Sequence, residues 1–135
     1  MDFARERADI VEVGRRLWTR GFVASNDGNI SVKVAPDRLL MTPASVSKYD
    51  MTPEMMVVTD VRGQVVSTAP GRKPSSEALM HLVAYRERPD VNAVVHAHPP
   101  LAERGAGAGV RRPRARRSCE APGCGRGVHA RACDR

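Results

Sequence analysis

Two different compositions meet near residue 100 of this 135-residue chain. Apolar residues recur at regular spacings before that point, whereas Arg, Gly, Ala and Cys make up 25 of the 35 residues after it. The second segment has too few large aliphatic side chains to offset the entropy that ordering costs. The sequence therefore predicts one folded unit over residues 1–100 and a disordered, Arg/Gly/Ala-rich tail over residues 101–135.

The tail also carries most of the net charge of +7. It holds nine arginines against three acidic residues, while residues 1–100 hold 13 basic and 12 acidic residues. The arginine run at 111–117 has no aromatic side chain to stack on bases, so we expect no nucleic-acid partner. The cysteines and the histidine of the tail lack the close spacing of a zinc knuckle, so we expect no metal there. Because its residues are those of G+C-rich codons, we interpret the tail as frameshift-derived.

The apolar segments are short. None approaches the roughly 18 residues that a membrane-spanning helix needs, so we expect no membrane partner. The first seven residues are mostly charged and no apolar segment follows them, which argues against a secretory signal. A cytoplasmic protein is the expectation.

The folded part alternates between the period of a helix and that of a strand. Apolar residues at helical spacing predict a helix over residues 3–18, and a second helix opens at 74–77 and stops at 88–90. The predicted strands span residues 30–34, 38–42, 56–60, 64–67 and 93–98. Their short connections suit hairpins, so we predict an α/β layered domain with a largely antiparallel sheet.

His96 and His98 stand out because residues i and i+2 of a strand point to the same face. Both imidazoles could therefore bind one zinc ion, and a catalytic zinc site uses three protein ligands and one open position. The alternative is a pair of surface histidines at the end of a strand. The spacing alone leaves both interpretations open.

Pro74-Ser75-Ser76-Glu77 is the second notable segment. Two hydroxyls and the free backbone N–H groups of a helix start form a natural phosphate site, and a carboxylate there interacts favourably with the helix dipole. Alternatively, Ser75 is a helix cap and Glu77 only a dipole partner. Segments 28–31 and 42–45 are compatible with simple turns beside strands, and we expect His81 to be a packed or capping histidine.

Four segments in this order resemble the class II aldolase/adducin family: Gly28-Asn29-Ile30-Ser31, Thr42-Pro43-Ala44-Ser45, Pro74-Ser75-Ser76-Glu77, and the run from Tyr85 to Pro99 that contains His96-Ala97-His98. The resemblance covers about residues 10–100. In style the chain is most similar to L-fuculose-phosphate aldolases and L-ribulose-5-phosphate 4-epimerases.

The resemblance implies an αβα sandwich with a largely antiparallel central sheet, and zinc-dependent, aldolase-type cleavage of a phosphorylated sugar. Zinc would stabilise the negative charge of the enediolate that cleavage leaves. The family pattern implies one Zn²⁺ per subunit and a homotetramer. Carried over residue by residue, it assigns His96 and His98 to zinc, Glu77 to acid/base catalysis, and Asn29, Ala44, Ser45, Ser75 and Ser76 to the substrate phosphate.

Intact members of the family continue beyond the His-x-His strand and supply a third zinc histidine from a later segment. This chain has no matching segment, so we interpret residues 1–100 as a fold that is incomplete at its C-terminus, with impaired activity. The alternatives are a 4-epimerase of the same family and a non-enzymatic, adducin-like assembly module. Adducin-type heads lack the zinc histidines, so the presence of His96, His98 and Glu77 favours descent from an enzyme.

Overall fold

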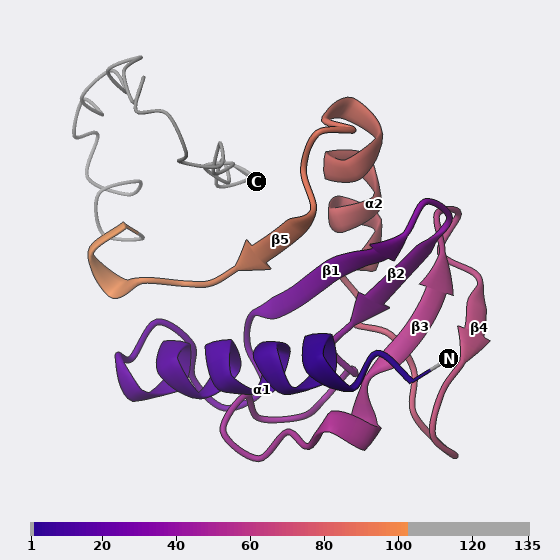
Figure 1. Ribbon diagram of the computed structural model, residues 1–135. Helices are drawn as coiled ribbons and strands as arrows, with labels where there is room; N and C mark the ends of the chain where they lie inside the picture. The colour runs from indigo at the N-terminus through magenta and orange to yellow at the C-terminus, as the bar shows by residue number, and fades with distance from the viewer. Residues whose placement is uncertain (1, 103–135) are drawn as a thin grey trace.

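The computed structural model describes residues 2–102 (Figure 1). The predictions made for residues 103–135 lie outside these described residues. The described part contains two α-helices, one short 3₁₀-helix and five strands in the predicted order. Their bounds are α1 Ala4–Thr19, β1 Asn29–Ala35, β2 Arg38–Met41, η1 Pro53–Met55, β3 Val57–Asp60, β4 Val65–Ser67, α2 Ala78–Glu87 and β5 Ala93–His96.

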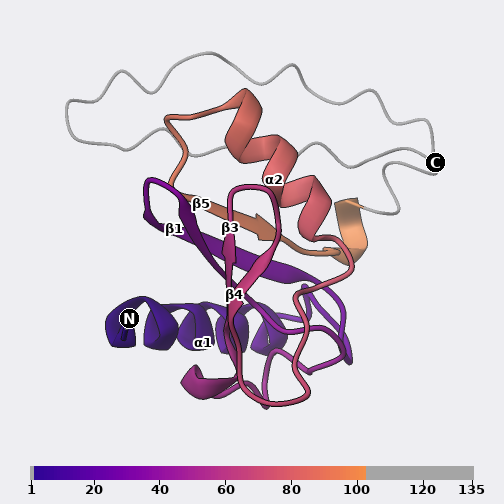
Figure 2. The same cartoon turned by 90° about the vertical axis from the view of Figure 1, so that its right-hand side faces the viewer.

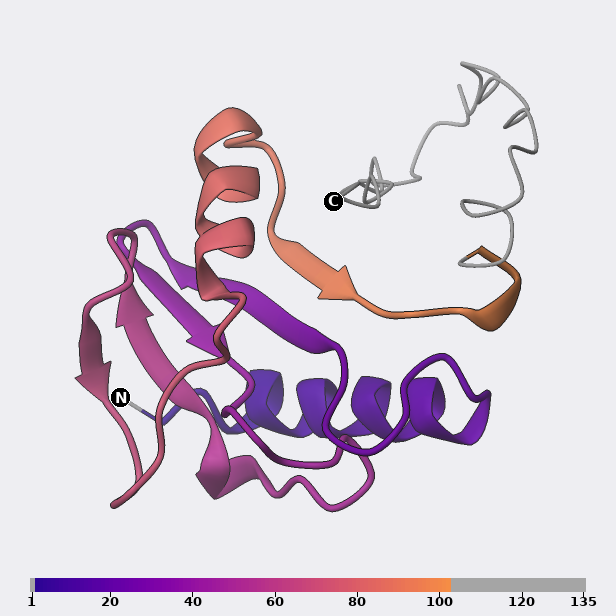
Figure 3. The ribbon, with the colours of Figure 1, turned by 180° about the vertical axis from the view of Figure 1, so that it is seen from behind.

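The five strands form one sheet in the order β4-β3-β2-β1-β5. Strands β1 to β4 are joined in sequence as an antiparallel meander, and α2 then returns the chain so that β5 pairs antiparallel with β1. Seen from behind, β5 runs along β1 at one side of the sheet (Figure 3). The predicted antiparallel α/β architecture is confirmed.

The two α-helices cover opposite faces of the sheet (Figure 2). Because successive strand residues point to opposite faces, Leu40 packs toward α1 while Leu39 and Met41 pack toward α2. Both faces are therefore buried in apolar clusters. The cluster on the α1 side contains Ile10, Val11, Ile30, Leu40, Val46, Met51, Met56 and Val58, and the cluster on the α2 side contains Leu39, Met41, Tyr85, Val91 and Val94.

Helix α1 is buried along one stripe only. Ile10, Val11 and Gly14 face the sheet, while Trp18 is 42% exposed and its ring lies 4.6 Å from that of Tyr49. The rest of the helix surface is charged, as expected for a helix that packs on a single face. Among residues 2–102, neither helix has the length and apolar character needed to cross a membrane.

Two predicted boundaries differ from the structure. Strand β5 ends at His96 instead of residue 98, because the backbone N–H of His98 donates to the carbonyl of Phe22 (2.8 Å), outside the sheet ladder. Helix α2 begins at Ala78 instead of 74–77, and Glu77 occupies its N-cap position. The interpretation of Ser75 as the cap of this helix is therefore wrong.

Gly28 precedes β1 in a left-handed conformation, with φ of +70°. A Cβ atom there would lie 2.8 Å from the carbonyl oxygen of His96 and 2.5 Å from a methyl group of Val23. Gly28→Ala is therefore expected to lower the free energy of unfolding by about 3 kcal/mol, from backbone strain and overpacking together. Urea denaturation measures this loss.

Gly21→Ala is the matched control. Gly21 has φ of +67°, but no atom lies within 4 Å of the added Cβ. Its substitution carries only the cost of the left-handed backbone, about 1 kcal/mol. Equal losses for the two variants would contradict the close packing of Gly28 against the end of β5.

Candidate active site

Three polar side chains from three elements meet at one end of the sheet. Asn29 opens β1, His96 ends β5, and the two are paired in the strand register. Glu77 precedes α2 and reaches both: its Oε2 accepts a hydrogen bond from Asn29 Nδ2 and lies 3.0 Å from His96 Nδ1. Glu77 makes no capping bond to its own helix, so its carboxylate serves this contact instead.

The chemistry of these groups determines where the protons lie. An ionised carboxylate only accepts hydrogen bonds, so the bond to Glu77 requires Nδ1 of His96 to be the N–H donor. The longer 3.4 Å contact of Asn29 Nδ2 with the same nitrogen is then not a hydrogen bond. In the neutral ring, Nε2 then holds the lone pair, which is the arrangement by which a carboxylate orients a metal-binding histidine. The side chain of Glu77 is 44% exposed and can therefore reach a ligand from solvent.

His98 lies beside His96, with ring centroids 4.6 Å apart and the planes tilted by 55°. Two neighbouring imidazoles are suitable donors for zinc, and the bond to Glu77 leaves Nε2 of His96 available, so the residues present fit part of a zinc site. Within residues 2–102, no three His, Cys, Asp or Glu side chains are grouped to hold a metal ion. A complete zinc site would need a ligand from outside this set.

The two segments predicted to hold phosphate lie side by side. Pro43 and Pro74 form an isolated antiparallel bridge, the Ala44 N–H donates to the carbonyl of Lys73 (2.9 Å), and the Ser75 N–H donates to the carbonyl of Thr42 (3.3 Å). Ala44 and Ser75 therefore offer no backbone donor in this conformation. The hydroxyl of Ser75 accepts the N–H of Glu77 at 3.3 Å, which ties this segment to the carboxylate.

Besides Glu77, the exposed residues of these two segments are Ser45 and Ser76. Among the described residues, neither backbone N–H makes a hydrogen bond. Ser45 is left-handed, with φ of 57°, a conformation that turns the chain sharply. These two residues present the available donors for an anion.

Asn29 contacts the second of these segments through Glu77. Its side chain is 3% exposed and its amide N–H faces Glu77, while its Oδ1 is buried and has no partner among the described residues. The structure thus brings Asn29, Glu77, His96 and His98 together, and groups Ala44 and Ser45 with Ser75 and Ser76.

Sequence reasoning missed Lys48, whose side chain is fully buried. Its Nζ donates to the carbonyl of Val46 (2.9 Å) and to that of Asn26 (3.4 Å). Burial lowers the pKa of Lys48, and the charges of Asp27 and Glu77 oppose this effect. Lys48 thereby joins the loop after β2 to the turn that precedes Asn29. In the sequence, Lys48 stands between polar residues, so no pattern indicated that its side chain is buried.

A buried polar network lies between β1 and α2. Ser31 Oγ lies 2.6 Å from Nδ1 of His81 and 2.8 Å from the hydroxyl of Tyr85. The prediction of a packed His81 is confirmed, since the residue is 1% exposed. Burial, and secondly the charge of His96, lower the pKa of His81 to about 4, and burial raises that of Tyr85 to about 12.

The depressed pKa of His81 makes the fold sensitive to acid. Between its ordinary value of 6.5 and about 4, the unfolded chain binds a proton that the folded chain does not. The free energy of unfolding therefore falls as pH decreases through this window, by about 3 kcal/mol in total. Urea denaturation at about pH 7 and about pH 4.5 measures the change. His81→Leu should lose this component, and an unchanged acid dependence in that variant would contradict the assignment.

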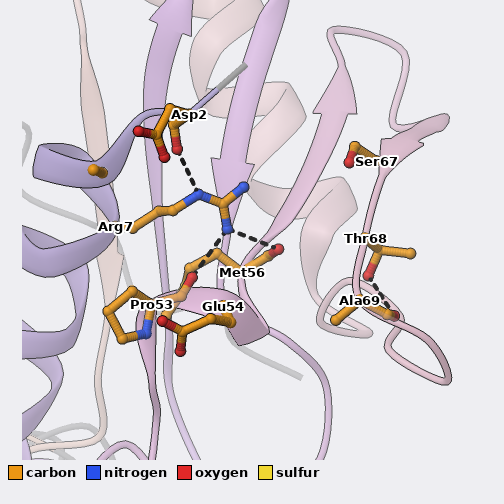
Figure 4. Close-up of a pocket in the computed structure, with 9 residues that line it drawn as sticks. Asp2, Arg7, Pro53, Glu54, Met56, Ser67, Thr68 and Ala69 are labelled. Atoms are coloured by element: carbon orange, nitrogen blue, oxygen red, sulfur yellow. Dashed lines mark hydrogen bonds between the residues drawn. The ribbon is translucent and has the colours of Figure 1, made fainter.

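A pocket elsewhere includes none of these site residues (Figure 4). Its central side chain is Arg7, which donates to the backbone carbonyls of Asp2 (2.9 Å), Pro53 (2.9 Å) and Met56 (3.4 Å). The guanidinium therefore joins α1 to η1. These contacts account for Arg7 as a structural residue.

Known proteins share the part of the chain that carries these residues. Residues 8–105 match the model of the Class II Aldolase and Adducin N-terminal domain. The chain is 38% identical over 100 residues to a 5-deoxy-D-ribulose 1-phosphate aldolase of Bacillus thuringiensis, which covers 73% of this chain and 46% of that protein. It is 34% identical over 99 residues to a methylthioribulose-1-phosphate dehydratase of Methylococcus capsulatus, covering 73% and 47%.

The fold agrees with a solved structure. The crystal structure of L-fuculose-1-phosphate aldolase from Thermus thermophilus matches with a TM-score of 0.59 and 31% identity, over 73% of this chain and 50% of that one. The chain thus spans about half the length of the relatives it matches. With its antiparallel sheet, its opposed helices and a match over residues 8–105, the chain belongs to the class II aldolase and adducin family, of which it carries the N-terminal domain.

Proposed function

We propose that this domain forms the acid/base and metal-binding part of a zinc-dependent, aldolase-type active site that cleaves a phosphorylated sugar. The observation that carries the proposal is the carboxylate of Glu77, held by Asn29 and His96 beside His98. A half-exposed carboxylate in a fixed position next to two imidazoles is suited to proton transfer to or from a substrate carbon. The relatives act on ketose 1-phosphates by name, which supports this class of substrate.

Each residue has a proposed role. His96 and His98 hold zinc, which supplies Lewis-acid stabilisation of negative charge on the substrate oxygens. As the C–C bond breaks, the hydroxyl on one carbon loses its proton to solvent and becomes the aldehyde carbonyl. Glu77 Oε2 gives a proton to the other carbon, which retains the electron pair of the bond, and removes that proton in the reverse direction. Asn29 holds the carboxylate in place through its Nδ2 hydrogen bond.

The phosphate is proposed to bind between the two adjacent segments described above. Ser75 and Ser76 offer hydroxyls, and Ser45 and Ser76 offer backbone N–H groups. Ala44 contributes through the shape of its loop, because its N–H already donates to Lys73. The proposal further includes, from the family resemblance, one zinc ion per subunit, a homotetramer and a cytoplasmic location.

A dehydratase reaction is the second candidate, favoured by the 34% identity to methylthioribulose-1-phosphate dehydratase. The same carboxylate would remove a proton from the carbon next to the carbonyl, and a hydroxyl would leave from the following carbon. The two reactions differ in their products. Cleavage of 5-deoxy-D-ribulose 1-phosphate yields dihydroxyacetone phosphate and acetaldehyde, whereas dehydration releases water and keeps the carbon chain intact.

The test follows the proton-transfer step by itself. The purified chain is incubated with dihydroxyacetone phosphate and zinc in D₂O, and NMR follows exchange of the hydroxymethyl C–H for deuterium. We expect exchange faster than with zinc alone, and its loss when zinc is chelated. Exchange no faster than the zinc blank would overturn the aldolase proposal, and water loss from methylthioribulose 1-phosphate would then favour the dehydratase.

A further inference from the structure

The buried network connects the two elements that position Glu77 and Asn29. His81 lies on α2 one helical turn after Glu77, and Ser31 lies on β1 two residues after Asn29. The 2.6 Å contact between His81 Nδ1 and Ser31 Oγ therefore joins helix and strand directly behind the contact between Glu77 and Asn29.

A count of protons defines the state of this network. If the Tyr85 hydroxyl donates to Ser31 and Ser31 donates to His81 Nδ1, then one group, the Nε2–H of His81, has no acceptor among the described residues. In the opposite direction, two groups have no partner in the described part of the chain: the Tyr85 proton lacks an acceptor, and the lone pair of Nε2 lacks a donor. The first arrangement leaves fewer unpaired groups, so His81 is the neutral Nε2–H form and accepts at Nδ1.

Apolar burial does not by itself select which face of α2 packs on the sheet. Ala78 and Leu82 pack against the sheet, but Leu79 is 73% exposed and Val83 is 45% exposed on the same helix. A helix with apolar residues on both sides needs another determinant of its orientation. A buried hydrogen-bond network is such a determinant, because it is satisfied in one arrangement only.

Packing alone does not account for His81. One of its ring nitrogens is buried without a partner among residues 2–102, which is unfavourable for stability, and an apolar side chain of similar size would avoid this. Without the imidazole, Ser31 and Tyr85 would still pair with each other at 2.8 Å. The histidine therefore has a role that stability does not explain.

We propose that His81 is a positioning residue: through its bond to Ser31 it sets the placement of α2 on β1, and thereby holds the Glu77 carboxylate against Asn29 and His96. This inference rests on the proposed function, in which Glu77 is the acid/base. It adds a residue that does not touch the reacting atoms and acts through the helix that carries Glu77.

The first test does not require activity. The side-chain amide of Asn29 donates to Glu77, so its ¹H–¹⁵N resonance reports this contact, and Glu77→Ala gives the reference position without it. We expect His81→Leu to move the Asn29 resonance most of the way to that reference. His81→Asn, which keeps an acceptor for Ser31 at the δ1 position, should leave it close to the wild-type position.

Ser31→Ala removes the same bond from the strand side, together with the bond between Ser31 and Tyr85, and it is the second variant if His81→Leu does not fold. It should displace the Asn29 resonance in the same way. A folded His81→Leu or Ser31→Ala protein with the wild-type resonance would overturn the proposal. So would an equal displacement in His81→Asn and His81→Leu.

The second test uses the deuterium exchange of dihydroxyacetone phosphate. We expect His81→Leu to lower the maximal exchange rate by about a hundredfold, the order of loss for a reacting group displaced by about an ångström. The half-saturating concentration should stay the same, and His81→Asn should restore most of the rate. If the wild type shows no exchange, the proposed function fails, while the Asn29 resonance still decides the role of His81.

Discussion

Glu77→Gln is expected to reduce deuterium exchange of dihydroxyacetone phosphate by about a thousandfold, within the range that a general acid/base contributes. The amide keeps the size of the carboxylate and can still accept the bond from Asn29, but it can neither remove nor supply a proton. Because the side chain is 44% exposed and caps no helix N–H, the fold should be unaffected. NMR exchange rates and a thermal unfolding midpoint measure the two quantities.

Glu87→Gln is the matched control on the same helix. Glu87 is exposed and contacts only Arg86 at 3.1 Å among the ion pairs of the described residues, and exposed pairs contribute little. Its exchange rate should equal that of the wild type. A Glu77→Gln protein that keeps the wild-type rate would remove Glu77 from the acid/base role.

Zinc binding should depend on both histidines at the end of β5. We expect His96→Ala and His98→Ala each to weaken zinc binding by about a hundredfold or more. Four-ligand sites bind with roughly 10–16 kcal/mol, so each ligand carries several kcal/mol. Competition with a chelating dye at fixed pH measures the dissociation constants.

Asn92→Ala provides the control, because Asn92 is exposed shortly before β5 and its side chain takes part in no contact described for the site. Its zinc affinity should remain that of the wild type. If both histidine variants kept the wild-type affinity, the metal would have to bind elsewhere. Reduced affinity in one variant alone would restrict the ligand role to that residue.

The order and type of the main elements could be predicted from the sequence because the strand connections are short and the alternation is regular. The boundaries of the elements near the candidate site could not be predicted in this way. Helix α2 begins at Ala78 because Pro74 is held in a bridge with Pro43 and residues 76–77 form a turn before the helix. This contact joins segments that are distant in sequence, so no local pattern reveals it.

The candidate site, too, could be predicted from the sequence only in part. The spacing of His96 and His98 and the position of Glu77 are visible in the sequence, but their contact with Asn29 depends on pairing of β1 with β5. The burial of Ser31 did have a signal. Two helices on a single antiparallel sheet cover both of its faces, so a polar residue between Ile30 and Val32 is buried and needs partners.

The sheet order has a consequence for how active molecules arise. Strands β1 to β4 pair with neighbours in the chain, but β5 must join β1 across a loop, with Asn29 and His96 separated by 67 positions. Long-range pairing of this kind is slow, since loop closure must precede any gain from contacts. We therefore expect a folding chain to acquire its meander first and the contact of Asn29 with His96 last. Substitutions that delay docking of β5 would then reduce the yield of competent molecules while leaving the rate of each one unchanged.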